Sequence, residues 1–225
     1  MNRISKILRC AAQVCLITFL YSNAIFAETF TVRAGKGDFP ATYMRDNHWE
    51  GMDIELIKEV FSRAKLDYQI LEIPFKRSLA QIRDGKVTLI PNLVKNKERS
   101  AYLNWLGPTR VTCIGLVVLK KDKNLPISSI EDLVGVSQQH KKKIGYLNGA
   151  SYSAFFDNRL KNDSALADVL YIVNDNKLKL QMLKANRIMG YFSDAFEIQQ
   201  RILDPEFSHQ YQGLALHSYR IEESC

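Results

Sequence analysis

Residues that could carry out chemistry are few and scattered in this sequence. The four histidines, at positions 48, 140, 209 and 217, lie far apart and lack the spacing of metal ligands. The chain has no HExxH, GxSxG, CxxC or GxxxxGK[S/T] motif, and Gly35-Lys36-Gly37 lacks the third glycine of a dinucleotide-binding loop. The residue types therefore predict no catalytic centre, no metal site and no cofactor.

One charged stretch raises a functional question. The segment VKNKERSAYLNW, residues 94–105, places Lys95, Lys97, Glu98 and Arg99 before an aromatic and apolar tail. Charge runs of this kind usually form a solvated surface. The question is whether one of these cations has a binding role.

The N-terminus has the pattern of a secretory signal peptide. Three cations, Arg3, Lys6 and Arg9, precede an apolar segment over residues 10–21, and small residues follow in SNAIFAET. The apolar part is too short for a membrane-spanning helix, which needs about 20 residues. We expect residues 1–27 to be removed, with cleavage after Ala24 or Ala27, and the mature protein to be periplasmic.

The charge of the mature chain argues against nucleic acid as a partner. The signal carries three of the 31 basic residues and no acid, so 28 cations face 24 acids, a net charge of +4. The only dense basic cluster, residues 140–143, has no interleaved aromatics and indicates a solvated loop. Two thiols, Cys113 and Cys225, remain in an oxidising compartment, and the sequence leaves their redox state open.

The elements that must position any site alternate between helix and strand. Residues 53–64 predict a helix with Asp53 as its cap and one apolar face, formed by Ile54, Leu56, Ile57, Val60, Phe61 and Ala64. Further helices are predicted at 78–85, 151–160 and 177–185, and SSIEDL at 128–133 is a helix-capping signal. Strands are predicted at 68–73, 87–90, 112–119, 143–147, 170–173 and 189–192. The alternation occurs in two blocks separated by the charged turn KKDKNLP, which predicts two α/β lobes. Two lobes without an evident catalyst suggest a cleft that holds a solute.

Five segments in order carry a family resemblance. They are GDFPATYMRDNHWEGMDIELIKEVF, PFKRSLAQIRDGKVTLIPNLVKNKERSAYLNWLGP, SSIEDLVG, KKIGYLNGASYSAFF and NRIMGYFSDAF. From Thr31 to Asp194 the chain resembles the family 3 extracellular solute-binding proteins of the amino-acid-binding type. The resemblance implies a two-lobed type II periplasmic-binding-protein fold whose lobes are joined by two crossing strands. Lobe 1 is then expected at 28–118, lobe 2 at 119–196, and a return segment to lobe 1 at 197–225.

The resemblance also implies a ligand site. Arg99 matches the family's arginine for the ligand α-carboxylate, and a guanidinium suits this task because it offers a planar two-pronged donor. Asp194 matches the acid that pairs with an α-ammonium, and its alternative role is a helix cap. Ser151 matches a position where a hydroxyl and backbone N–H groups receive the carboxylate, and its alternative role is also a cap.

Three further positions follow from the same comparison. Phe39 and Phe75 match aromatic walls of the cleft, and each could instead belong to the core. Arg77, in PFKRSL, matches a branch of the family and would be a second cleft cation, or else a surface residue. Val94 and Met189 depart from the family pattern, since a hydroxyl and an acid are usual there, which puts a standard α-amino-acid ligand in doubt.

The chain stops 31 residues after Asp194, at Cys225. The family resemblance implies a longer return to the first lobe, so we expect this part of lobe 1 to be truncated. Apolar surface of the first lobe would then be uncovered.

Together these observations predict a monomeric, exported solute-binding protein. Its ligand is expected to be a small polar molecule that bears a carboxylate, delivered to the permease of an ABC importer or to a membrane sensor. Two alternatives stay open. One is a lyase on the same fold, similar to the cyclohexadienyl or arogenate dehydratases, with Glu72 or Asp194 as general acid. The other is a degenerate remnant that binds nothing.

Overall fold

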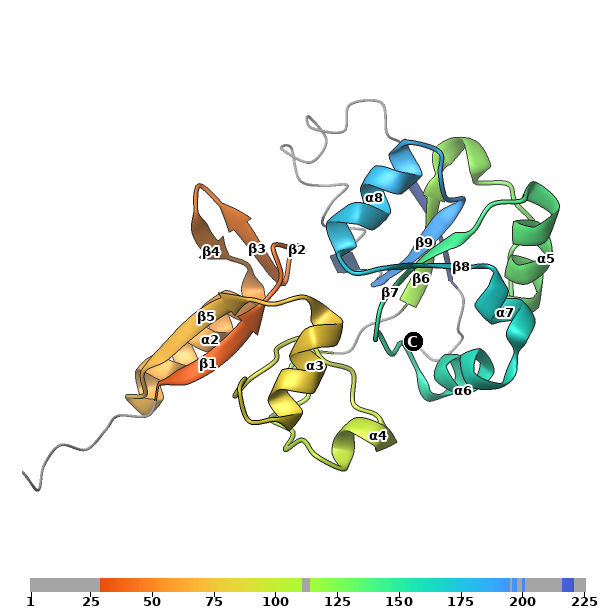
Figure 1. Ribbon diagram of the computed structural model, residues 1–225. Coiled ribbons are helices and arrows are strands. Elements are labelled where there is room, and N and C mark those ends of the chain that lie inside the picture. Colours follow the sequence, from red (N-terminus) through yellow and green to blue (C-terminus); the bar gives the residue numbers. More distant parts are fainter. Residues whose placement is uncertain (1–28, 111–113, 195, 198–199, 201–215, 221–225) are drawn as a thin grey trace, which may run out of the picture.

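The first lobe combines two small sheets with three helices. The structure, a computed structural model, describes residues 29–110, 114–194, 196–197, 200 and 216–220. A parallel pair, β1 (Phe30–Ala34) and β5 (Tyr68–Glu72), lies beside an antiparallel sheet of β2 (Gly37–Asp38), β3 (Thr42–Arg45) and β4 (His48–Glu50). The helices are α2 (Met52–Ala64), α3 (Phe75–Arg83) and the short α4 (Lys97–Ser100), as Figure 1 shows.

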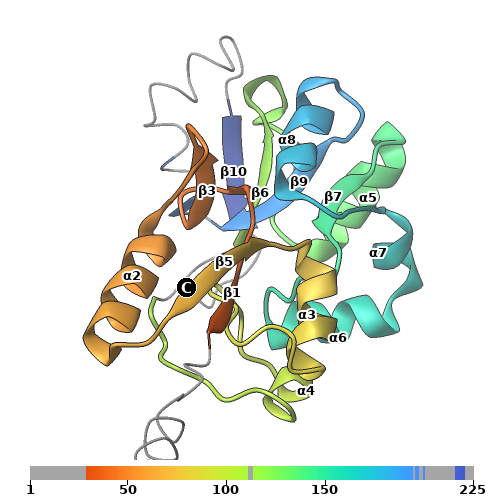
Figure 2. The ribbon, with the colours of Figure 1, turned by 60° about the vertical axis from the view of Figure 1, so that its left-hand side comes forward.

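The second lobe is built on one five-stranded sheet. Its strand order is β10-β6-β9-β7-β8, with β6 (Ile114–Leu119), β7 (Ile144–Leu147), β8 (Leu170–Val173), β9 (Gly190–Asp194) and β10 (Leu216–Arg220). Parallel pairing joins β7 to β8 and β9, whereas β6 pairs antiparallel with β9 and β10. The helices are α5 (Ile130–His140), α6 (Ala154–Asn162), α7 (Ser164–Asp168) and α8 (Asn176–Lys184), with a 3₁₀ turn at Lys120–Asp122. Figure 2 shows the two lobes side by side.

The predicted alternation of strands and helices is confirmed for the predicted elements, except at residues 87–90, whereas strands β1 to β4 and helices α4 and α7 were not predicted. Only one bridge, between Val32 and Leu89, forms where a strand was expected at residues 87–90. The prediction that Asp53 caps α2 is wrong, because Gly51 is the N-cap and Asp53 lies in the first turn, bound to Arg110. The structure also places β6, expected in the first lobe up to residue 118, in the sheet of the second lobe.

The capping signal before α5 is confirmed. Ser129 is the N-cap, and its side chain accepts a hydrogen bond from the backbone N–H of Asp132 at 3.0 Å. The Asp132 carboxylate in turn accepts bonds from the backbone and side chain of Ser128, which lower its pKa. Two adjacent serines therefore fix the start of this helix.

One of the hydrophobic clusters connects the lobes. The second lobe has a large cluster between its sheet and α5, α6 and α7, which includes Leu116, Leu133, Phe156 and Phe192. The cluster on the other side of the sheet contains Phe75 of the first lobe, and Leu79 and Leu93 of the first lobe pack against it. Apolar contact therefore contributes to holding the lobes together.

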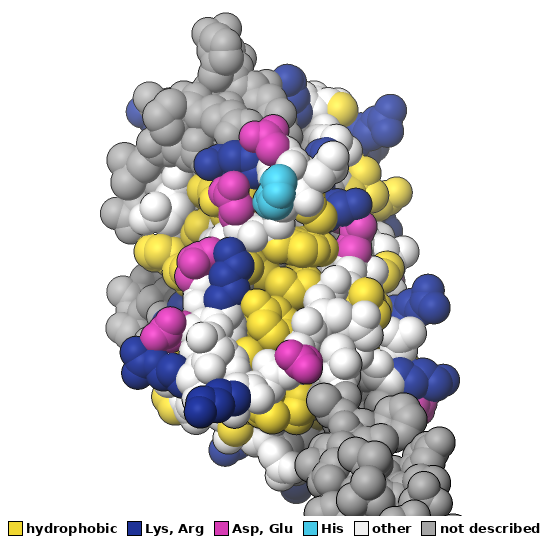
Figure 3. Space-filling model, turned by 90° about the vertical axis from the view of Figure 1, so that its left-hand side faces the viewer, with side chains coloured by type: hydrophobic (Ala, Val, Ile, Leu, Met, Phe, Trp, Pro, Cys, Tyr) yellow, Lys and Arg dark blue, Asp and Glu magenta, His cyan; other side chains and the backbone are white. Residues whose placement is uncertain are grey.

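The outer face of the first lobe is only partly covered. On α2, Ile54, Ile57 and Phe61 are buried, whereas Leu56 is 44% exposed and Val60 is 51% exposed. Hydrophobic side chains gather on this side of the molecule in Figure 3. The predicted apolar face of the helix is therefore wider than the surface against which it packs.

Some expectations concern residues that the structure does not describe. The predicted signal peptide, Cys113, Cys225 and most of the return segment lie outside the described residues. Within the described residues, no helix combines the length and the apolar character needed to cross a membrane.

Candidate ligand-binding site

Arg99 links the two lobes through its guanidinium group. It lies on α4 and is 4% exposed. Its Nη1 donates to the Val94 carbonyl at 2.7 Å in its own lobe, and its Nη2 donates to the Gly149 carbonyl at 2.9 Å in the second lobe. The Phe75 ring centroid lies 5.8 Å from the guanidinium carbon. Burial lowers the pKa of Arg99. In this closed arrangement the group is engaged by protein carbonyls.

The second-lobe partner of Arg99 is a close-packing glycine. Gly149 follows β7 with a φ of +80°, which favours glycine. A Cβ atom built there would lie 2.9 Å from Cδ of Lys76 on α3. A side chain at this position would have to displace the side chain of Lys76.

Ser151 forms a second link between the lobes. It is 7% exposed, and its hydroxyl accepts a hydrogen bond from Nδ2 of Asn96 at 3.1 Å and donates one to Asp157. Asn96 is also the N-cap of α4, because its Oδ1 accepts from the Arg99 backbone N–H at 2.9 Å. The cap of α6 is Ser153 instead of Ser151. Ser151 therefore contacts the first lobe directly.

A third link runs through Asp38. Its Oδ2 accepts from Nη1 of Arg33 at 2.6 Å, and its Oδ1 accepts from Nδ2 of Asn176, the first residue of α8, at 2.9 Å. Arg33 is 5% exposed and also donates from Nε to the Ile73 carbonyl at 3.1 Å. The ion pair of Arg33 and Asp38 in the first lobe is thus hydrogen-bonded to the side-chain amide of Asn176 in the second lobe.

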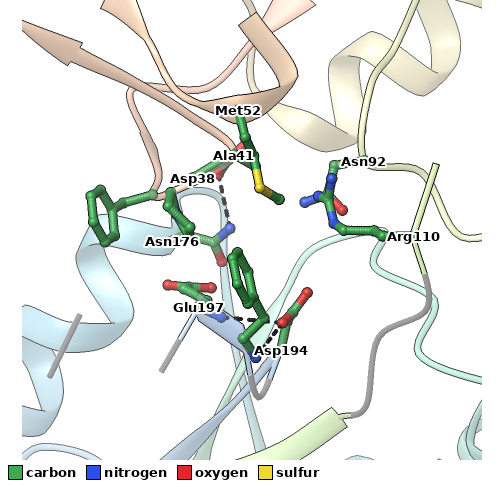
Figure 4. A pocket seen from close by; sticks show the side chains of 11 residues that line it. Asp38, Ala41, Met52, Asn92, Arg110, Asn176, Asp194 and Glu197 are labelled. Atoms are coloured by element: carbon green, nitrogen blue, oxygen red, sulfur yellow. Dashed lines mark hydrogen bonds between the residues drawn. The ribbon is translucent and has the colours of Figure 1, made fainter. Parts of the chain in front are cut away.

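A pocket lies next to this third link and takes its walls from both lobes. Its lining residues are Asp38, Phe39, Pro40, Ala41, Met52, Asn92, Arg110, Asn176, Asp194, Phe196 and Glu197. Figure 4 shows Asn176 and Arg110 on different sides of it, with Met52 between them. The cavity volume is about 30 Å³, which holds a few water molecules at most. The cavity in this arrangement is therefore smaller than an amino acid.

Asp194 lines the pocket and also makes the contacts of a helix cap. It ends β9 and lines the pocket. Its Oδ1 accepts from the backbone N–H groups of Phe196 at 2.7 Å and Glu197 at 3.2 Å, which is a helix-capping contact. No described cation forms an ion pair with it within 4.0 Å. Its carboxylate is therefore held in place by the backbone while it faces the pocket.

The other expected residues are distributed over three places. Phe39 lines the pocket, half-buried, and its ring contacts Tyr43 at a centroid distance of 5.1 Å. Phe75 lies in the interlobe cluster beside Arg99. Arg77 is exposed on α3 and does not line the pocket. Glu72, the alternative general acid, lies half-exposed in an ion pair with Lys36 and is absent from the pocket lining.

The structure therefore brings Asp194 and Phe39 together in the pocket and places Arg99, Phe75 and Ser151 in interlobe contacts. Sequence reasoning missed the other polar lining residues, above all Arg110, Asn176 and Asp38. The described residues contain no group of three or more His, Cys, Asp or Glu side chains that could hold a metal ion.

Comparison with known proteins supplies the family and the fold. Residues 31–213 match the family described as bacterial extracellular solute-binding proteins, family 3. No curated protein matches the chain in sequence. An ancestral arginine-binding protein bound to glutamine is similar in structure, with a TM-score of 0.69, 19% identity, and coverage of 86% of this chain and 79% of that one.

Two bacterial structures are similar to the same degree. The amino acid ABC transporter substrate-binding protein AbpA from Streptococcus pneumoniae, bound to L-arginine, has a TM-score of 0.68 and 18% identity, and the match covers 88% of this chain and 77% of that one. The arginine-, lysine-, histidine-binding protein ArtJ from Geobacillus stearothermophilus has a TM-score of 0.69 and 17% identity, with 87% and 76% coverage. These likenesses show the type II periplasmic-binding-protein fold. The chain belongs to the bacterial extracellular solute-binding proteins of family 3.

Proposed function

We propose that this protein is an exported solute-binding protein that captures a small, amino-acid-like molecule bearing a carboxylate in the pocket between its lobes. The observation that carries the proposal is the composition of this pocket, because its walls come from both lobes and include carboxylates and a guanidinium group. A solute that contacts both lobes stabilises the closed form relative to the open form. The captured solute would pass to the permease of an ABC importer or to a membrane sensor.

The ligands bound in the similar structures, glutamine and arginine, support an amino acid as the solute. The N-terminal pattern of three cations followed by an apolar segment supports export to the periplasm. We propose Asp194 and Phe39 as ligand contacts, because both line the pocket. For Arg99 and Ser151 the contacts support a role in closing the lobes. The proposal involves binding without conversion of the solute.

A thermal-shift screen of the mature protein against the 20 L-amino acids tests the proposal. A ligand at 100 times its Kd stabilises the folded state by about 2.7 kcal/mol. For a chain of this size the expected rise in Tm is roughly 5 to 10 °C. A screen in which no amino acid raises Tm would contradict the proposal.

The Asp194→Asn variant makes the test specific to the pocket. Asparagine keeps an oxygen that accepts from the Phe196 and Glu197 N–H groups, so the helix cap is retained while the charge is lost. We expect the variant to fold with nearly unchanged Tm and to bind the selected amino acid at least tenfold more weakly by isothermal titration. Asp168→Asn, at an exposed carboxylate on α7, is the matched control and should bind as the wild type does.

A further inference from the structure

Arg110 is held at the pocket by a buried carboxylate. Its Nη1 donates to Oδ1 of Asp53 at 2.6 Å, and its Nη2 lies 3.4 Å from Oδ2 of the same residue. The side chain of Asp53 is 5% exposed and that of Arg110 is 20% exposed. Because Asp53 lies in the first turn of α2, this ion pair fixes the guanidinium group on a rigid element.

One edge of this guanidinium group has no acceptor among the described residues. Arginine carries five N–H donors, and the Asp53 contact uses one on Nη1 and one on Nη2. Nε of Arg110 is buried, and no described residue accepts its hydrogen. A buried charged donor without an acceptor is unfavourable. The Nε and Nη2 hydrogens lie on one edge, which matches the two oxygens of a carboxylate.

Asn176 presents the complementary group. Its Nδ2 donates to Asp38, which is itself fixed by Arg33. Since a carboxylate only accepts, this contact sets the orientation of the amide and leaves Oδ1 as an acceptor. Oδ1 of Asn176 is buried, and no described residue donates to it. Within the described part of the chain, Arg110 therefore lacks an acceptor at Nε and Asn176 lacks a donor at Oδ1.

Arg99 is in a different situation. Its Nη1 and Nη2 already donate to the carbonyls of Val94 and Gly149, and it does not line the pocket. Arg110 is the one described cation among the lining residues.

We infer that Arg110, and not Arg99, binds the carboxylate of the ligand, and that Asn176 Oδ1 together with Asp194 binds an ammonium or other N–H donor at its opposite end. The ligand class is then a small zwitterion. This inference rests on the proposed function, because it assigns contacts within the same pocket. It makes Arg110 the residue that distinguishes a free carboxylate from its neutral amide.

The test compares an amino acid with its carboxamide. Isothermal titration measures binding of L-arginine and L-argininamide, and of L-glutamine and L-glutaminamide, so that the ratio of the two Kd values reports recognition of the carboxylate alone. We expect the wild type to favour the free acid at least tenfold. In Arg110→Lys, which keeps a charge near Asp53 but loses the Nε edge, the ratio should fall to less than threefold.

Three further variants locate the effect. Arg99→Lys should weaken acid and amide by the same factor and leave the ratio intact, because it affects lobe closure. Asn176→Ala should likewise weaken both probes without changing the ratio. Arg83→Lys, at an exposed arginine on α3 that stacks on Tyr102, should change nothing.

The outcomes separate the two proposals. A wild type that binds none of the 20 L-amino acids would overturn the proposed function and this inference with it. This inference alone would be overturned if the wild type binds an amino acid and Arg110→Lys keeps the wild-type ratio of the Kd values for amide and acid. Loss of this ratio in Arg99→Lys instead would overturn it as well. If circular dichroism shows that Arg110→Lys is unfolded, the double variant Asp53→Asn, Arg110→Gln replaces the ion pair with a neutral pair, and it should show the same loss of the ratio.

Discussion

Removal of the Arg99 guanidinium group should destabilise the closed protein. Arg99→Ala deletes the donors to the Val94 carbonyl, at 2.7 Å, and to the Gly149 carbonyl, at 2.9 Å. Arg99→Lys keeps the charge, but its single ammonium group cannot reproduce both directions of the planar group. The alanine variant should therefore lose more stability than the lysine variant.

The magnitude follows from the two hydrogen bonds. A hydrogen bond to a charged group contributes roughly 1.5 to 3 kcal/mol, so the loss of both costs about 3 to 6 kcal/mol. Burial lowers the pKa of Arg99 because desolvation disfavours the charged form. This desolvation offsets part of the stabilisation by the two hydrogen bonds, so we expect the loss of stability in Arg99→Ala to lie in the lower half of this range. At roughly 2 to 4 °C per kcal/mol for a chain of this size, Tm should fall by about 6 to 18 °C in Arg99→Ala and by about half as much in Arg99→Lys.

Chemical denaturation and calorimetry of the ligand-free protein provide the measurement. Lys97→Ala is the matched control, because Lys97 is an exposed cation on the same helix and exposed charges contribute less than about 1 kcal/mol. If Tm of Arg99→Ala stays within about 2 °C of that of Lys97→Ala, the carbonyl contacts contribute nothing and the reasoning is refuted.

Three other changes test separate parts of the structure. Gly149→Ala puts an L residue at a φ of +80° and a Cβ atom 2.9 Å from Lys76 Cδ, so Tm should fall more than in Gly135→Ala, where nothing lies within 4 Å of the added atom. Equal Tm values would argue against a constraint at this position. Asp38→Ala leaves buried Arg33 without its carboxylate and should lower the free energy of unfolding in urea by about 3 to 5 kcal/mol. The control Asp84→Ala, at an exposed ion pair, should lower it by less than about 1 kcal/mol. Similar losses in the two variants would contradict a stabilising role of the Arg33–Asp38 pair. Hydrogen bonds to Asp163, above all from the Leu166 N–H group, lower its pKa below the usual 3.8. Its contribution to the free energy of unfolding is therefore present above pH 3.8 and is lost as the pH falls through the lower pKa of the folded state. Asp163→Asn should flatten this dependence of the free energy of unfolding on acidic pH, and an unchanged slope would refute the capping explanation.

The fold was predictable because its signals are local. Periodicity placed helices α2, α3, α6 and α8 and strands β5 to β9, and the adjacent serines placed the start of α5, whereas β1 to β4 were not predicted. The exception at residues 87–90 is also physical, since Val87, Leu89 and Ile90 predict a buried strand, but the segment pairs with β1 only through the Val32–Leu89 bridge and the backbone hydrogen bonds around it. Local patterns thus fix the type of an element better than its pairing.

The pocket was predictable only in part, because its contacts join distant residues. Asp53 and Arg110 are 57 positions apart, and Asp38 and Asn176 are 138 apart. Nothing near Arg110 in the sequence indicates that a buried carboxylate of another segment holds it. Asp53 itself had a local explanation as a helix cap, which concealed its tertiary role. Asp194 and Phe39 were found because the family resemblance extends over their positions.

The position of Phe75 also has a consequence for the temperature dependence of lobe closure. Together with Leu79 and Leu93 it brings first-lobe apolar surface into a cluster of the second lobe. Separation of the lobes exposes part of this surface to water, so opening should carry a positive change in heat capacity. Because the apolar contribution to closure weakens on cooling, the population of the closed form should fall at low temperature. The protein should therefore release its solute more readily in the cold than a protein whose lobes were joined by hydrogen bonds alone.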